Sequence, residues 1–166
     1  FRPSNEHDLR DEDDRRPDHG GATLNSDSLV DQLFELLRND IINGKIAQGE
    51  KITEITLAQR LGLRRINTFS GCPGSDPDAH YPNWVTCPWP EDFQEVLDYQ
   101  WNQVLIPYWR ETAAFAAEHG VTQIALEMHP GFCVYHTESL LRLRGAVGEQ
   151  IGANLDPSHL IWQGMD

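Results

Sequence analysis

The chain has 166 residues, of which 39% are apolar, so it can form one domain or two small ones around a packed core. Its formal net charge of −13 argues against a protein that binds nucleic acid over its whole surface. No apolar stretch approaches the roughly 20 residues of a membrane span, and no signal-peptide pattern is present.

The three cysteines, Cys72, Cys87 and Cys133, include no CxxC pair. Their odd number favours free thiols in a reducing cytosol over a disulfide framework or a structural zinc site. We therefore expect a cytoplasmic protein without a membrane partner. Because the sequence begins with Phe1 rather than Met, we also expect a fragment of a longer protein.

Residues 1–27 are polar and carry many of the acidic side chains, including the run Asp11-Glu12-Asp13-Asp14. So little apolar surface cannot offset the conformational entropy that is lost on ordering. We predict a disordered acidic lead-in.

Two helices separated by a turn are predicted after this lead-in. Ser28 and Asp31 have the spacing of a capping box at the start of a helix over 28–43. Thr53 can cap a second, short helix over 54–61. Helix, turn and short helix followed by basic residues form the first part of a helix-turn-helix. The apolar stripe predicted for the first helix comprises Leu29, Leu33, Leu36, Leu37 and Ile41.

The stretch DQLFELLRNDIINGKIAQGEKITEITLAQRLGLRR resembles the N-terminal winged helix-turn-helix of the GntR transcription regulators. The resemblance implies a truncated DNA-binding module over residues 28–65. In that family a Ser-Arg-Thr-Pro recognition helix and a two-stranded wing follow, whereas this chain reads RRINTF. The implied partner is DNA, held by a weak contact in which Arg60, Arg64 and Arg65 touch phosphates. The alternative for these arginines is solvated charge at a helix end.

The next segment predicts a strand and a long loop. Residues 66–69 form a short apolar run that ends at a Ser-Gly-Cys-Pro-Gly turn. Residues 75–90 are rich in Pro and aromatic residues, and loops of this length are usually functional or disordered. Trp84 or Trp89 can lie against the face of a sugar or simply pack onto the rim of the fold, and the composition leaves both alternatives open.

Helices and strands alternate in the remainder of the chain. Residues 91–119 predict a helix that Pro107 breaks or kinks. A strand ending at Glu127 follows, then a shorter helix capped by Thr137, then a strand that ends before Asp156. From residue 66 onward the pattern is therefore β-α-β-α-β with three parallel strands. The buried stripe predicted for the long helix comprises Phe93, Val96, Leu97, Trp101, Val104 and Leu105.

Glu127 and Asp156 each end an apolar run, and each is followed within three residues by Pro and His. Parallel strands place both carboxylates at one edge of the sheet, where α/β folds bind their ligands. Carboxylates with imidazoles nearby suit divalent cations such as Mg²⁺, Mn²⁺ or Co²⁺. We therefore predict a metal site at this edge; the alternative is a structural ion pair or a helix cap.

Several long motifs in residues 66–166 are distinctive: NTFSGCPG, YPNW, PWP, IPYW, ALEMHPGF, LLRLR and GANLDPSHLIWQG. They resemble the sugar phosphate isomerases and epimerases of the xylose-isomerase-like TIM barrels. The implied fold class is α/β, a partial (β/α)8 barrel of about three strands with an N-terminal partial helix-turn-helix. The resemblance implies that Glu127 and Asp156 bind a divalent metal (Mn, Mg, Co or Zn) and that Glu127 is also catalytic. It further implies that His159 and His129 contact the substrate.

The chemistry that the resemblance implies is proton transfer on a sugar or sugar phosphate through an enediolate. The metal acidifies the C–H group beside the carbonyl, and a carboxylate removes and returns the proton. The family's remaining ligands, a His and a Glu, would lie beyond Asp166, and its first two strands would precede residue 66. We therefore expect an incomplete barrel with residual or no activity, which self-association can stabilise.

Two other function classes stay open. The first is a DNA-binding regulator of the GntR type whose sugar-binding half senses a ligand. The second is lyase or endonuclease chemistry at the same metal site, which is disfavoured because residues 66–166 are acidic and lack the basic tracks that a DNA backbone requires.

Overall fold

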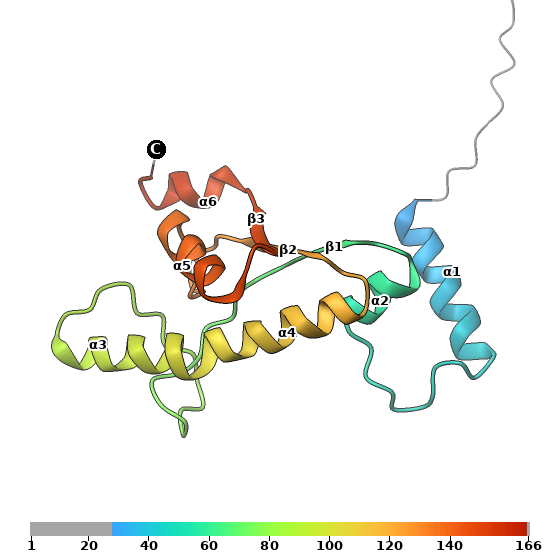
Figure 1. Cartoon of the computed structure of the whole chain (residues 1–166), viewed down its shortest axis with the longest axis horizontal. Helices are drawn as coiled ribbons and strands as arrows, with labels where there is room; N and C mark the ends of the chain where they lie inside the picture. The colour runs from blue at the N-terminus through green and yellow to red at the C-terminus, as the bar shows by residue number, and fades with distance from the viewer. Residues whose placement is uncertain (1–27, 166) are drawn as a thin grey trace, which may run out of the picture.

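The structure, a computed structural model, describes residues 28–165, so the predicted lead-in over 1–27 lies outside the described residues (Figure 1). Six α-helices, one π-helix and three strands are present in this part of the chain. In chain order they are α1 Leu29–Ile42, α2 Glu54–Arg60, β1 Arg65–Thr68, α3 Glu91–Asp98, the π-helix η1 Tyr99–Leu105, α4 Ile106–Glu118, β2 Gln123–Glu127, α5 Thr137–Val147, β3 Ile151–Asn154 and α6 Pro157–Trp162. None of the described helices is long and apolar enough to cross a membrane.

The three strands form one parallel sheet in the spatial order β1-β2-β3. Ile66 pairs with Ile124, and Ile124 pairs with Ile151. Neighbouring parallel strands need a long crossover between them, which α3, η1 and α4 supply for the first pair and α5 for the second. The predicted β-α-β-α-β order is confirmed, and β1 begins one residue earlier than expected.

The two faces of the sheet differ in polarity. Side chains alternate between the faces along each strand. Ile124, Leu126 and Ile151, each at most 1% exposed, share one core with residues of α4 and α5. By the same alternation and register the opposite face carries small and polar residues: Asn67, Ala125, Glu127, Gly152 and Asn154.

Two buried tryptophans connect η1 and α4 to neighbouring parts of the fold. Trp101 of η1 and Trp109 of α4 are each 3% exposed. The indole N–H of Trp109 donates to the carbonyl of Ser70 at 3.0 Å, and the guanidinium of Arg142 on α5 lies 4.1 Å from the centre of the Trp101 ring. These contacts hold α4 against the loop that follows β1, and η1 against α5.

The sequence predicted a break or a kink at Pro107, and the helical segment continues through this residue without a break. Pro107 lies in the first turn of α4, directly after the π-helix η1. A proline ring crowds the carbonyl four residues earlier and cannot donate to it, and the wider π-helical turn relieves that conflict. The predicted buried stripe is correct only toward the C-terminal end, since Trp101 and Leu105 are buried whereas Phe93 is 40% exposed.

Gln100 ties the long loop to the helical layer. Its side chain is 1% exposed, and its Nε2 donates to the carbonyls of Pro73, Gly74 and Asn83 at 2.9, 3.2 and 2.6 Å. A single buried amide therefore joins the first part of the loop to its middle. Trp89, farther along, is 77% exposed.

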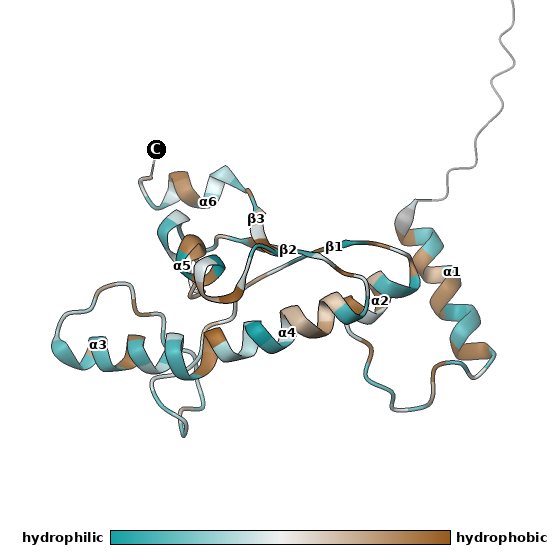
Figure 2. Ribbon diagram, viewed as in Figure 1, coloured by the Kyte–Doolittle hydropathy of each residue, from teal (hydrophilic) through white to brown (hydrophobic). Residues whose placement is uncertain are grey.

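The predicted capping box at Ser28 and the predicted cap at Thr53 are both present, and Thr53 forms a capping box of its own with Thr56. Ile55 and Ala58 of α2 belong to the main core. The described side chains of α1 are exposed or half-buried, and Figure 2 shows apolar residues along this helix at the side of the molecule. In the described residues α2 leads into β1 with no third helix between them, as the missing recognition helix implied. Because α2 also packs into the main core, a separate helix-turn-helix module finds no support.

The cap of α5 differs from the prediction by one residue. The helix begins at Thr137, but its N-cap is His136. The Nδ1 atom of His136 accepts the backbone N–H of Ser139 at 3.2 Å, and the Ser139 hydroxyl donates to the His136 carbonyl at 2.7 Å. Threonine is a far commoner cap than histidine, so sequence preference pointed to the wrong one of two neighbouring residues.

Candidate metal centre

Glu127 is the last residue of β2, and its carboxylate is held at both oxygens. The Nδ2 group of Asn154, at the end of β3, donates to Oε2 at 2.9 Å. The other oxygen, Oε1, lies 3.1 Å from Nε2 of His159. The side chain is 21% exposed, so the carboxylate is partly shielded from water in a fixed orientation.

Asp156 lies two residues after β3 and caps the N-terminus of α6. Its Oδ1 accepts the backbone N–H of Ser158 at 2.9 Å. The side chain of Ser158 makes a further hydrogen bond, and together these are the main reason why the pKa of Asp156 lies below its usual value. His159 and His129 act in the same direction, so the carboxylate stays charged in mild acid.

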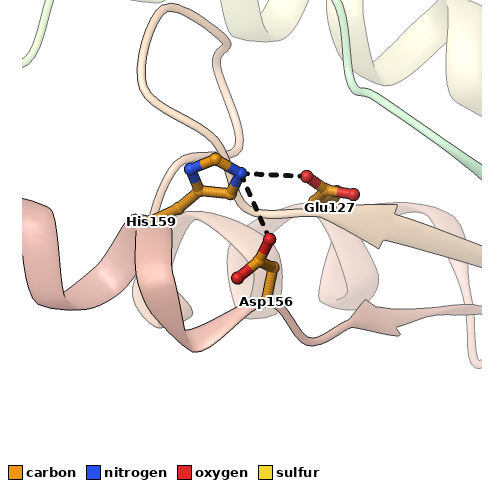
Figure 3. Close-up of side chains that lie close together, drawn as sticks. All are labelled: Glu127, Asp156 and His159. Atoms are coloured by element: carbon orange, nitrogen blue, oxygen red, sulfur yellow. Dashed lines mark hydrogen bonds and ion pairs between the residues drawn. The ribbon is translucent and has the colours of Figure 1, made fainter.

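His159 joins the two carboxylates. Pro157 starts α6 directly after the cap, and the helical spacing of three residues brings His159 back over Asp156. Its Nε2 lies 3.1 Å from Glu127 Oε1 and 3.5 Å from Asp156 Oδ2, as the dashed lines in Figure 3 show. The three donor atoms all lie within 4.8 Å of one another.

The chemistry of this donor set fits a divalent cation. Atoms that each lie about 2.1 Å from one cation are about 3 Å apart when they occupy neighbouring positions, which matches the spacing of His159 to both carboxylates. Two carboxylates and an imidazole are ligands that Mn²⁺, Co²⁺ and Zn²⁺ accept. The three side chains come from one edge of a parallel sheet, as the sequence predicted for Glu127 and Asp156.

His129 lies beside this group, in the loop that follows β2. Its ring centre is 4.1 Å from that of His159, and its Nδ1 is 2.6 Å from the carbonyl of Pro130. Phe69 and Phe132, stacked at 4.8 Å, both contact the His129 ring edge-on. The result is an aromatic wall next to the carboxylates.

Trp84, for which the sequence left open contact with a substrate or packing on the rim, lies in the loop between β1 and α3 and packs against Tyr135. Its ring meets that of Tyr135 edge-on at 5.4 Å, and the side chain is 39% exposed. Tyr135 belongs to the loop between β2 and α5, the same loop that contains His129. The exposed part of the ring leaves a surface on which a ligand can stack.

The three arginines predicted to touch DNA do not form a free basic patch. The Arg60 guanidinium is paired with the carboxylates of Asp40 and Glu50. Arg65 begins β1, at the edge of the sheet opposite Glu127, and its Nε donates to Gln123 at 2.9 Å. Arg64, the residue before Arg65, has an exposed side chain.

Asn154 is the site residue that sequence reasoning missed. It pairs with Glu127 in the register of β2 and β3, which places the two side chains on the same face. A polar residue inside the apolar run IGANL, two positions before Asp156, was the available indication.

Residues 50–166 match the family model for xylose isomerase-like TIM barrels. The chain is also 43% identical over 133 residues to the uncharacterized protein YfiH of Bacillus subtilis (strain 168). That alignment covers 77% of this chain and 42% of YfiH, so the chain spans about two fifths of the length of this curated relative. The matched family range begins in the turn before α2 and therefore includes α2 as well as the sheet.

Proposed function

Because the chain belongs to the xylose isomerase-like TIM barrel family, we propose that it contributes part of the metal site of an enzyme that isomerises or epimerises a sugar or sugar phosphate. The observation that carries this proposal is the convergence of Glu127, Asp156 and His159 within 4.8 Å at the carboxyl edge of the sheet. This edge is where barrels of parallel strands bind their substrates.

In this proposal Glu127 and Asp156 hold the cation, and Glu127 also removes and returns a proton on the substrate. A divalent metal bound there would polarise the carbonyl and hydroxyl oxygens of the sugar and so acidify the C–H group beside them. Asn154 keeps the Glu127 carboxylate in one orientation during the transfer. His159 is placed to be the third protein donor to the metal or to contact a substrate hydroxyl, His129 to contact the substrate at the rim, and Trp84 to stack on the sugar.

The described donor set is smaller than the usual coordination sphere of these metals. Mg²⁺ and Mn²⁺ commonly have about six ligands, and only three protein donors meet in the described residues. Water and substrate oxygens occupy the remaining positions in the simplest case. Catalytic activity is thus a stricter test than metal binding, and the two are measured separately.

Metal binding is tested first with the full chain stripped of metal by a chelator. Mn²⁺ is titrated in, and the free ion is followed by its electron paramagnetic resonance signal. Loss of a residue that only hydrogen-bonds to a metal ligand typically lowers metal affinity about 10–100-fold. Glu127→Gln and Asp156→Asn change the ligands themselves, so each should weaken binding by more than about 100-fold. Glu138→Gln is the matched control, because Glu138 is an exposed carboxylate on α5 outside this group.

Proton transfer is tested in D₂O with Mn²⁺ and a panel of ketoses and ketose phosphates. The expected result is incorporation of deuterium at the carbon beside the carbonyl, which Glu127→Gln abolishes. Manganese affinity that is equal in the wild type and in both site variants would refute the metal site. Binding without exchange in any substrate would refute the isomerase or epimerase assignment for this chain while leaving the metal site intact.

A DNA-binding regulator was the alternative raised by the sequence. The described residues favour it less, since Arg60 is neutralised by two carboxylates and α2 is followed by a strand. Binding to a palindromic duplex that weakens steeply with salt would support it. Cleavage of duplex DNA in the presence of Mn²⁺ would instead support endonuclease chemistry at the same edge.

A further inference from the structure

Two cysteines that are distant in sequence lie side by side next to the candidate metal centre. Cys72 is in the loop after β1, and Cys133 is in the loop after β2. Cys133 belongs to the main buried cluster, and Cys72 packs against that cluster. The backbone N–H of Cys133 donates to the carbonyl of Gly71 at 3.0 Å, so the two loops are joined directly at this point.

The backbone around the pair is held in place from both sides. The Ser70 hydroxyl accepts the N–H of Val134 at 2.9 Å in a buried position, and the Ser70 carbonyl accepts the indole N–H of Trp109. The direct hydrogen bond joins Cys133 to Gly71, the residue before Cys72, and backbones joined in this way run about 5 Å apart. That spacing falls within the range of about 4.4–6.8 Å that disulfides span between Cα atoms.

The two thiols differ in access to solvent. Cys133 is 6% exposed. Cys72 is half-buried and lines a cavity of about 290 Å³ together with Phe69, Val104 and Tyr108. A small oxidant can therefore reach Cys72 through the cavity. Cys133 is not among the residues that line this cavity.

We propose that Cys72 and Cys133 form a dithiol that a peroxide converts into an intramolecular disulfide. The Cys72 thiolate attacks one oxygen of the peroxide, the O–O bond breaks, and the sulfur becomes a sulfenic acid as hydroxide leaves. The Cys133 sulfur then attacks the sulfenic sulfur, the S–S bond forms, and water leaves with the Cys133 proton. The dithiol loses two electrons overall, and the peroxide gains them.

The electrostatics of the pair agree with this order of events. The hydrogen bond from the Cys133 thiol is the main reason why the pKa of Cys72 lies below its usual value, although burial acts in the opposite direction. The same hydrogen bond and burial raise the pKa of Cys133. Cys72 is thus the better nucleophile, and Cys133 stays protonated until the sulfenic acid has formed.

The disulfide would cross-link the two loops that carry the aromatic wall. Phe69 precedes Cys72 by three residues, and Phe132 is adjacent to Cys133; their rings stack on each other and contact His129. Oxidation therefore fixes the spacing of the loops beside the carboxylates. This inference does not depend on the identity of the metal or of the substrate.

The test uses the full chain treated with hydrogen peroxide and analysed by peptide mapping under non-reducing conditions. The expected product is one intramolecular cross-link between the peptides that contain Cys72 and Cys133, which dithiothreitol reverses. Cys87→Ser is the matched control, because Cys87 is exposed and outside the pair, and it should give the same cross-link. Cys133→Ser should stop at a Cys72 sulfenic acid that dimedone traps.

Two outcomes would overturn the proposal, and both are read from the wild-type chain. One is a cross-link that involves Cys87 in place of either partner. The other is recovery of Cys72 and Cys133 as free thiols, or as separately overoxidised residues, after excess peroxide. Because neither outcome depends on a variant, poor folding of a cysteine substitution leaves the test intact.

Discussion

Replacement of Asn154 by Ala tests whether Glu127 is held in place for metal binding. The variant removes the hydrogen bond from Nδ2 to Glu127 Oε2, which measures 2.9 Å. A hydrogen bond to a charged group contributes about 1.5–3 kcal/mol. Glu127 is 21% exposed, so water can partly replace the lost donor, and the lower end of that range applies.

An effect of about 1.5 kcal/mol corresponds to roughly a tenfold change in an equilibrium constant. We therefore expect the Kd for Mn²⁺, measured by electron paramagnetic resonance, to rise about tenfold in Asn154→Ala. The matched control is Asn102→Ala, which removes a similar bond, 2.6 Å long, from an exposed Asn to the Asp98 carboxylate on the long helix. This control should leave the Kd unchanged.

Circular dichroism and the urea midpoint establish that both variants are folded. An Asn154→Ala protein that is folded and binds Mn²⁺ as tightly as the wild type would refute the reasoning. An equal loss of Mn²⁺ affinity in Asn102→Ala would also refute it, because the loss in Asn154→Ala could then not be assigned to the hydrogen bond with Glu127.

Three further predictions concern stability. Leu143→Ala, at a side chain with no exposed surface, should lower the free energy of unfolding by about 2–5 kcal/mol in urea titrations. Ser70→Ala should lower it by about 1–3 kcal/mol and speed hydrogen exchange at the Val134 amide, which loses its buried acceptor. For Asp156 the folded pKa lies below the usual 3.8, so its cap stabilises α6 above that pH and loses its effect as the pH falls through the folded pKa. The urea midpoints of wild type and Asp156→Asn should therefore converge as the pH is lowered from 7 toward 3.

Each of these predictions has a contrasting measurement. Leu141→Ala changes an exposed leucine on the same helix, 59% exposed, and should shift the midpoint far less than the change at Leu143. Slow exchange at Val134 in the Ser70 variant would show that another group protects that amide. A difference between wild type and Asp156→Asn that stays constant down to pH 3 would contradict a charged cap.

Much of the architecture was predictable because its causes are local. The alternation of apolar runs with helix-length segments indicated three parallel strands, and the structure confirms them. The capping box at Ser28 was read from Asp31, three residues on, and the cap at Thr53 from its residue type; both are present. The shared edge of Glu127 and Asp156 also followed, since parallel strands joined by crossovers must point the same way.

The errors arose where a local preference competed with packing. A threonine is normally a better cap than a histidine, yet His136 caps α5 because its ring reaches Ser139. A proline normally interrupts a helix, yet the helix continues through Pro107 because a π-helical turn precedes it. The GntR-like stretch formed its two helices as expected, but α2 packs into the barrel core through Ile55 and Ala58.

The amino-acid sequence by itself determined that three strands run parallel and that Glu127 and Asp156 emerge at the same edge of the sheet. Only the tertiary structure decided how they meet: His159 lies between the two carboxylates, Asn154 holds Glu127, and the backbone of Cys133 is bonded to Gly71 beside Cys72. The physical reason is that, apart from the local contact between Asp156 and His159, these contacts join separate strands and loops. Their distances depend on the register of the sheet and on the packing of α4 and α5, and no local spacing along the chain encodes either one.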